Sequence, residues 1–167
     1  MADDHINRIA IIPGSFDPIT LGHINLVRRA LEQYDEVVLA IMINPNKKYM
    51  FTMKQREQIA KSALSTLPHV RVISSDGMLW KLAEDIGACA IVKGYRNDKD
   101  LEYEREMAEF NLVHNPNAPT ILLQSDDNLE NISSTLVREK IINNESLDKL
   151  LPKEAIEEIN KIIVKRI

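Results

Sequence analysis

The sequence has a single cysteine and no surplus of basic side chains, and both shortages narrow what the protein can be. One cysteine, Cys89, excludes an internal disulfide, and no spacing typical of a zinc site occurs. We interpret Cys89 as a small buried core residue of a protein in a reducing cytoplasm. The formal net charge of −4 argues against a nucleic-acid partner, because phosphate backbones select clustered lysine and arginine. A small anionic ligand stays compatible with that charge, since a local basic site can lie on an acidic protein.

Long apolar runs, repeats and flexible linkers are missing as well. No apolar run approaches the roughly 20 residues that a membrane-spanning helix needs, so no membrane partner is expected. The first residues are acidic and lack an apolar core, unlike a secretion signal. No internal repeat, low-complexity tract or Gly/Ser-rich linker interrupts the 167 residues. We therefore predict one domain over residues 1–167, which is long enough to bury a sizeable core.

What the sequence does contain is an alternation of two kinds of segment. Short β-branched runs predict strands buried on both faces, at residues 6–12, 37–43, 70–73, 90–92 and 120–123. Longer amphipathic segments predict helices, at residues 22–34, 52–67, 78–86, 101–114, 133–143 and 153–167. This alternation predicts an α/β fold: a Rossmann-like, doubly wound, five-stranded parallel sheet with helices on both faces and a further helix at the C-terminus.

Two of the predicted helix ends carry recognisable capping residues. Thr52 and Gln55 have the spacing of a capping box, in which each side chain satisfies a free backbone N–H at the start of a helix. Gly87 follows the helix predicted at residues 78–86 and suits the left-handed conformation of a C-cap. Local sequence therefore predicts where these two helices begin and end.

Ligands of parallel α/β sheets bind beyond the carboxyl ends of the strands, so the segments after the strands are candidate sites. These segments are residues 13–23, 44–51, 74–78, 93–100 and 124–135. In the first of them, Gly14 permits a sharp backbone turn and Gly22 leaves room for a base or a phosphate. His23 then lies in the first turn of a predicted helix, where free N–H groups attract anions. The pattern is neither G-x-G-x-x-G nor a P-loop.

Two stretches far apart in the chain together indicate a triphosphate site. Thr20-Leu-Gly-His23 resembles the (H/T)-x-G-H signature of the nucleotidyltransferase superfamily, in which the Gly packs under the adenine or ribose and the His contacts the triphosphate. Residues 132–138, Ile-Ser-Ser-Thr-Leu-Val-Arg, resemble the second signature, I-S-S-T-x-x-R. Three hydroxyls at a helix N-terminus would form an anion site for the β- and γ-phosphates of ATP. Alone, the second stretch would more often be a helix cap.

The middle of the chain narrows the resemblance to one family. Residues 44–52 read Asn-Pro-Asn-Lys-Lys-Tyr-Met-Phe-Thr, and residues 93–104 read Lys-Gly-Tyr-Arg-Asn-Asp-Lys-Asp-Leu-Glu-Tyr-Glu. Both resemble stretches of bacterial phosphopantetheine adenylyltransferase, and the match runs in order over nearly the full length. The resemblance implies transfer of the adenylyl group of ATP to 4'-phosphopantetheine, giving dephospho-CoA and pyrophosphate. It also implies use of Mg²⁺, bound mainly through ATP phosphates, and assembly as a homohexamer.

The same resemblance implies how the reaction would run. The phosphate of the acceptor, already ionised at neutral pH, is the nucleophile, so neither a general base nor a covalent enzyme intermediate is needed. Catalysis then depends on alignment and on stabilising charge at the α-phosphoryl group. His23 and Lys47 are expected to supply that charge: by resemblance, His23 stabilises the transition state and Lys47 binds the acceptor phosphate.

Further site residues are implied by resemblance, and none is expected to ligate a metal. The nucleotide site would comprise Ser15, Phe16, His23, Gly94, Tyr95, Arg96, Glu104, Leu129, Glu130, Asn131, Ile132, Ser133, Ser134 and Thr135. The acceptor site would comprise Ser15, Lys47, Leu79 and Lys93, although Leu79 is equally compatible with plain helix core. Two departures from the family pattern occur. Lys93 replaces the usual Arg and loses its bidentate fork, and residues 129–131 lack the usual aromatic side chains.

Two other functions stay open on the sequence alone. A related adenylyl- or cytidylyltransferase, acting on nicotinate mononucleotide or glycerol phosphate, would share both outer signatures but not the stretches around Lys47 and Arg96. A non-catalytic nucleotide-binding domain would keep the fold without needing His23 and Lys47 together.

Overall fold

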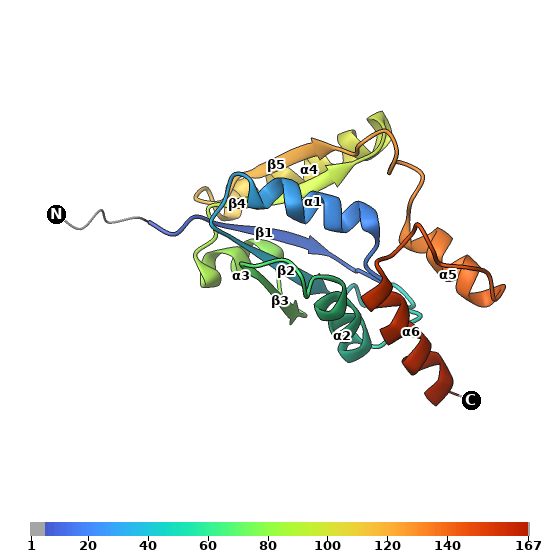
Figure 1. The fold of residues 1–167 in the computed structure, drawn as a ribbon. Helices are drawn as coiled ribbons and strands as arrows, with labels where there is room; N and C mark the ends of the chain where they lie inside the picture. Colours follow the sequence, from blue (N-terminus) through green and yellow to red (C-terminus); the bar gives the residue numbers. More distant parts are fainter. Residues whose placement is uncertain (1–5, 167) are drawn as a thin grey trace.

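A computed structural model describes residues 6–166 of the chain, and its five strands form one parallel sheet (Figure 1). The strands are β1 (Ile9–Gly14), β2 (Glu36–Met42), β3 (Val70–Ser75), β4 (Ala90–Tyr95) and β5 (Thr120–Gln124). Their order in the sheet is β3-β2-β1-β4-β5, so the chain winds outward from β1 in one direction and then from β4 in the other. The predicted doubly wound α/β class is confirmed.

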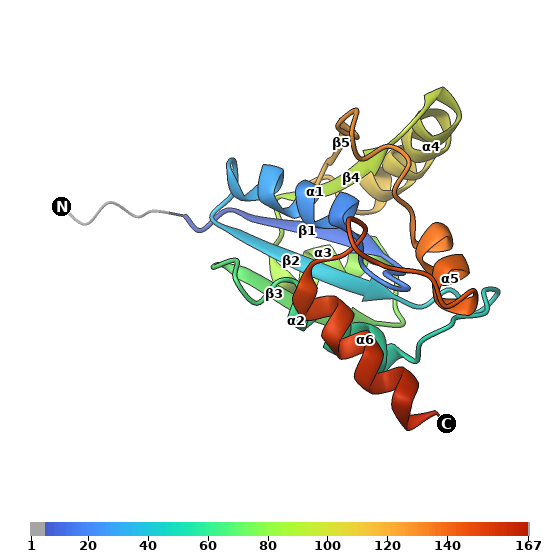
Figure 2. The same ribbon diagram turned by 45° about the vertical axis from the view of Figure 1, so that its right-hand side comes forward.

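Helices cover both faces of the sheet (Figures 1 and 2). They are α1 (Leu21–Leu31), α2 (Met53–Ala63), α3 (Leu79–Ile86), α4 (Asp98–His114), α5 (Ser134–Ile142) and α6 (Lys153–Lys165). One face is covered by α1, α2 and α6, whose side chains Val27, Ile59 and Ile159 belong to the larger core cluster. The other is covered by α3 and α4, with a smaller cluster that includes Ile11 and Ala83. Helix α5 lies beyond the carboxyl ends of the strands.

The strand predictions were right in number and order but wrong in two details, and the predicted burial of Cys89 was wrong as well. The first strand was expected to begin at Ile6, which is 81% exposed; β1 begins at Ile9, the first residue to pair with β2. The strands β3 and β5 were expected to be buried on both faces, yet neither contains a fully buried residue, because both lie at the edges of the sheet. Cys89 is half-buried rather than buried.

Helix limits follow the capping side chains. The predicted capping box is present: Gln55 N–H donates to Thr52 Oγ1 at 3.1 Å, and Thr52 N–H donates to Gln55 Oε1 at 3.0 Å. Gly87 ends α3 with φ 71°, as a left-handed C-cap. Helix α4 begins before the predicted residue 101, because the side chain of Asn97 accepts the N–H of Asp100 at 2.9 Å. The predicted end of the last helix at residue 167 lies outside the described residues.

The sheet opens at the point where the winding reverses. Strands β1 and β2 pair from Ile9 to Gly14, whereas β1 and β4 pair only through Ala10 and Ile11. Beyond Ile11 the two strands part, and this is the switch point at which α/β sheets bind ligands. Among the helices of residues 6–166, none combines the length and apolar character needed to cross a membrane.

Candidate active site

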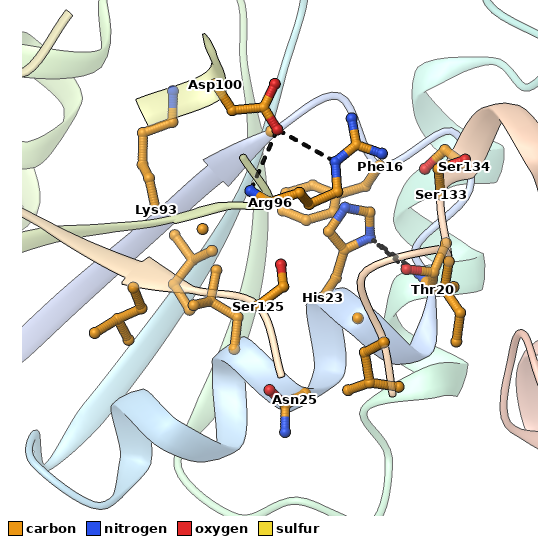
Figure 3. A pocket seen from close by; sticks show the side chains of 18 of the residues that line it. Phe16, Thr20, His23, Asn25, Lys93, Arg96, Asp100, Ser125, Ser133 and Ser134 are labelled. Carbon is orange, nitrogen blue, oxygen red and sulfur yellow. Dashed lines mark hydrogen bonds and ion pairs between the residues drawn. The ribbon is translucent and has the colours of Figure 1, made fainter. Parts of the chain in front are cut away.

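A cavity of about 540 Å³ lies where β1 and β4 part. Segments that follow four of the five strands contribute to its walls, and Figure 3 shows side chains from α1, β4, α4 and the start of α5 converging on it. The predicted site residues that line the cavity are Ser15, Phe16, His23, Lys47, Lys93, Gly94, Arg96, Glu104, Leu129, Ile132, Ser133, Ser134 and Thr135. The fold therefore gathers residues that are more than a hundred positions apart in the sequence.

Four predicted site residues do not line this cavity: Leu79, Tyr95, Glu130 and Asn131. Leu79 begins α3 and packs against the smaller core cluster, as plain helix core would. Other residues that line the cavity were missed by the sequence analysis; they include Arg29, Asp100, Tyr103, Ser125 and Asp126. Asp100 and Tyr103 stand within the quoted 93–104 stretch, which was the available signal, whereas no motif marks Arg29.

The loop after β1 brings an aromatic ring against the candidate catalytic histidine. Phe16 has a φ of 46°, and its ring meets the His23 ring edge to face, with centroids 4.9 Å apart. The same ring lies against Gly14, where an added Cβ would be 3.0 Å from two of its carbons. Gly14 is thus needed for close approach of the Phe16 ring as well as for the turn.

His23 is a neutral hydrogen-bond donor in this structure. The backbone N–H of Thr20 donates to His23 Nδ1 at 3.0 Å, so the proton of the neutral ring is on Nε2 (Figure 3). Burial in the cavity wall, with a smaller contribution from the positive charge of Arg96, lowers the pKa of His23 to about 4. The catalytic role expected for His23 stays a prediction, but its low pKa leaves no positive charge on the ring of the free protein at neutral pH. It offers an Nε2–H dipole instead.

Permanent cations line the cavity, and most of them are paired with carboxylates. The pairs are Lys93–Glu104 at 2.6 Å, Arg96–Asp100 at 3.3 Å and Arg29–Asp126 at 3.7 Å. Glu104 is well covered, and among the described residues its Oε2 has no partner besides Lys93 in this ion pair. Lys93, the residue that departs from the family pattern, thus has its charge balanced within the wall. A phosphate ligand must share or displace these carboxylates.

Lys47 differs from the other cavity cations because no described carboxylate lies within ion-pair distance of it. It is exposed, in the segment between β2 and α2. That segment is closed on itself: Lys47 N–H donates to Asn44 O at 3.0 Å, and Asn44 N–H donates to Tyr49 Oη at 2.7 Å. The unpaired ammonium of Lys47 is therefore available to an incoming anion.

The three hydroxyls at the start of α5 are not equivalent. Ser133 Oγ caps the helix by accepting Leu136 N–H at 3.1 Å, and Thr135 Oγ1 accepts from Arg138 at 3.1 Å. Ser134 Oγ donates its proton to the carbonyl of Pro18 at 2.7 Å. Ser133 and Thr135 each keep a hydroxyl proton to donate to a phosphate, and Ser134 does not. The predicted three-hydroxyl anion site is thus reduced to two donors and the N-terminal amides of the helix.

The loop after β1 is held by side chains distant in sequence, which sequence analysis left without a role. Arg138 Nη1 donates to the carbonyl of Asp17 at 2.9 Å. The buried carboxylate of Asp17 accepts the N–H groups of Met50 at 2.9 Å and Phe51 at 3.0 Å. The loop is thereby joined both to α5 and to the segment that carries Lys47.

Gly22 lines the cavity, and the protein itself does not demand a glycine there. An added Cβ would meet nothing closer than 3.5 Å, which is ordinary van der Waals contact. The described residues hold no group of three or more His, Cys, Asp or Glu side chains placed to bind a metal. A metal ion in this cavity would need most of its ligands from a bound molecule, as Mg²⁺ commonly does with phosphates.

The arrangement suits a polyphosphate substrate and phosphoryl chemistry. A neutral donor, an unpaired ammonium, two hydroxyl donors and a helix N-terminus surround one cavity. Comparison with known proteins agrees with this chemistry: residues 11–140 match the model of the cytidylyltransferase-like family.

Three relatives, each named phosphopantetheine adenylyltransferase, align over most of the chain. The protein of Francisella tularensis subsp. novicida is 41% identical over 155 residues, covering 92% of this chain and 96% of the relative. That of Rhizorhabdus wittichii is 37% identical over 152 residues, covering 91% and 92%. That of Caldanaerobacter subterraneus subsp. tengcongensis is 39% identical over 132 residues, covering 79% and 82%.

Proposed function

Because the chain belongs to the phosphopantetheine adenylyltransferases, within the cytidylyltransferase-like family, we propose that it transfers the adenylyl group of ATP to 4'-phosphopantetheine. The products are dephospho-CoA and pyrophosphate, in coenzyme A biosynthesis. One observation carries the proposal: the neutral donor His23 and the unpaired cation Lys47 line the same cavity. The first suits a phosphoryl group in transit, and the second suits the phosphate of an acceptor.

In the proposed reaction, an oxygen of the acceptor phosphate attacks the α-phosphorus of ATP. The new P–O bond forms as the bond from the α-phosphorus to the α,β-bridging oxygen breaks, and its electron pair leaves with pyrophosphate. No proton has to be removed from the nucleophile. His23 Nε2–H would donate to a non-bridging α-oxygen as negative charge rearranges there, and Lys47 would hold the attacking phosphate in line.

The nucleotide phosphates would lie against the start of α5. The hydroxyls of Ser133 and Thr135, together with the free amides of that helix end, would bind the departing pyrophosphate. Arg96 would exchange Asp100 for a phosphate oxygen. We propose that the enzyme uses Mg²⁺, which would be bound mainly through ATP phosphates and would neutralise charge on the polyphosphate.

We also propose that the enzyme works in the cytoplasm and assembles as a homohexamer. The single cysteine suits a reducing compartment. Support for assembly comes from α4 and β5, which leave large apolar side chains in solvent: Tyr103, Met107, Phe110, Leu112, Val113 and Ile121. Large apolar side chains exposed in this way become buried where a protein interface covers them. Light scattering coupled to gel filtration would give about six chain masses, and a monomer would contradict the assembly.

Pyrophosphate release tests the catalytic proposal. The protein is incubated with ATP, Mg²⁺ and either 4'-phosphopantetheine or nicotinate mononucleotide, and separately with CTP and glycerol phosphate. Release with 4'-phosphopantetheine alone is the expected result. Release with another acceptor would move the chain to a different transferase specificity, and ATP binding without release in any mixture would indicate a nucleotide-binding protein.

A further inference from the structure

Arg56 is a buried cation beside the cavity that no described carboxylate neutralises. Arg56 is 2% exposed. It lies on α2 and does not itself line the cavity. Two contacts hold its guanidinium. Nη1 donates to the carbonyl of Ser15 at 2.8 Å, and the carbon at its centre lies 3.9 Å from the centre of the Tyr49 ring. Its Nε is buried, and no residue within 6–166 accepts a hydrogen bond from it. A charge buried in this way is costly, which calls for a reason beyond stability.

The carbonyl that Arg56 binds belongs to the same peptide group as the N–H of Phe16. This peptide is trans, so the carbonyl and the N–H point in opposite directions. Arg56 holds the carbonyl on the side of α2, which leaves the Phe16 N–H directed away from that helix. No described residue accepts a hydrogen bond from the Phe16 N–H, and Phe16 lines the cavity. The amide is thus an unused donor beside the nucleotide site.

We propose that Arg56 is a positioning residue that orients and polarises the Ser15–Phe16 peptide, so that the Phe16 amide donates to a phosphate oxygen of the bound nucleotide. A hydrogen bond from a charged donor to a carbonyl strengthens the N–H of the same amide as a donor, because the group is conjugated. The stacked Tyr49 ring ties the same guanidinium to the segment that carries Lys47. This inference rests on the proposed nucleotide site and adds a residue that does not touch the ligand.

If Arg56 served only stability, its replacement would lower the melting temperature and leave ATP affinity unchanged. The proposed positioning role predicts the opposite result in both measurements. Replacing a buried, unpaired charge by an apolar side chain of similar length is often neutral or stabilising. We therefore expect R56M to melt at the same temperature as the unmodified protein or higher, while binding ATP about tenfold more weakly, as loss of a charge-assisted positioning bond would give. R56K, which keeps the charge and one donor, should recover at least half of the lost affinity on a logarithmic scale.

The test combines isothermal titration calorimetry with ATP and thermal melting followed by circular dichroism. K61M is the matched control, because Lys61 is exposed on the same helix and forms an ion pair with Glu57 alone among the residues that the structure describes. This substitution should leave ATP affinity unchanged. Unchanged ATP affinity in R56M would overturn the proposal, and so would a lower melting temperature with no rescue of affinity by R56K. Should R56M not fold, R56Q carries the same test, with weaker ATP binding expected and unchanged binding refuting.

Failure of this inference and failure of the proposed function are distinguishable. ATP binding is measured without an acceptor, so it does not depend on which molecule receives the adenylyl group. Weakened binding in R56M supports the role of Arg56 even if 4'-phosphopantetheine is not adenylylated. Unchanged binding refutes it even if the unmodified enzyme turns over as proposed.

Discussion

Acidification should destabilise this protein through His23, and the size of the effect follows from its environment. Burial and the nearby Arg96 lower the pKa of His23 from 6.5 to about 4. An unfolded chain takes up the proton near pH 6.5, whereas the folded chain resists it until about pH 4. The unfolded state therefore binds more protons between these values, and stability is complete above pH 6.5 and lost as the pH falls.

The magnitude follows from the width of that window. Lowering the pKa of His23 from 6.5 to about 4 corresponds to about 3 kcal/mol of stability lost by pH 4, which solvent screening in the open cavity reduces to about 2 kcal/mol. The perturbation is the substitution H23N, whose side-chain oxygen can still accept the N–H of Thr20 while no ring remains to be protonated. Urea unfolding, followed by far-ultraviolet circular dichroism at pH 7.5 and pH 4, gives the free energy of unfolding for both proteins.

The unmodified protein should lose about 2 kcal/mol more stability than H23N between these pH values. Equal losses, or a larger loss in H23N, would refute the argument. Nitrogen NMR of the ring gives a second reading: at pH 7 the spectrum should show a neutral ring protonated on Nε2. A His23 signal that titrates near pH 6.5 would contradict the burial argument directly.

Three further substitutions test separate parts of the site. G22A should fold with an unchanged or higher melting temperature, because its added Cβ meets nothing closer than 3.5 Å. If ATP occupies that space, calorimetry should show ATP affinity lower by at least about tenfold; unchanged affinity would show that ATP does not occupy it. K47M should lower kcat/KM for the acceptor about 10- to 100-fold while ATP affinity is preserved. K48M is the control, since Lys48 does not line the cavity; an equal loss of kcat/KM in both variants would indicate an effect of general surface charge. G14A places a Cβ 3.0 Å from the Phe16 ring, so the ring must move and kcat should fall about tenfold; unchanged turnover in a protein of normal circular dichroism would mean that the ring contact is dispensable.

The features that sequence predicted well are those decided within a few residues. The capping box of Thr52 and Gln55 and the left-handed Gly87 need only their neighbours, and both are present. The order of strands and helices follows from β-branched runs and amphipathic segments, which are also patterns among residues close in sequence. The exposure of β3 and β5 could not be read locally, because a β-branched run has the same appearance at the edge of a sheet as at its centre.

Within the site, it was easier to predict which residues take part than to predict their protonation and hydrogen bonding. Thr20-Leu-Gly-His23 marks the histidine, but its neutrality depends on burial by a fold that the motif does not describe. The hydroxyl of Ser134 was expected to face a phosphate, and it is used instead by the carbonyl of Pro18 from the other end of the sequence. Arg56 belongs to no recognised motif, so only three-dimensional contacts give it a role.

The loop after β1 depends on parts of the chain that are made much later. Its carbonyl groups at Ser15, Pro18 and Asp17 are held by side chains 41, 116 and 121 positions further along the sequence. A chain emerging from the ribosome can pair β1 with β2 early, but the contacts to the carbonyls of Pro18 and Asp17 cannot form until α5 has been synthesised and docked. We expect nucleotide binding to appear only in the last stage of folding, after loops of this length have closed. Capture on immobilised ATP would then separate completed molecules from chains stalled short of α5, which makes the substrate a sensor of folding quality as well as a reactant.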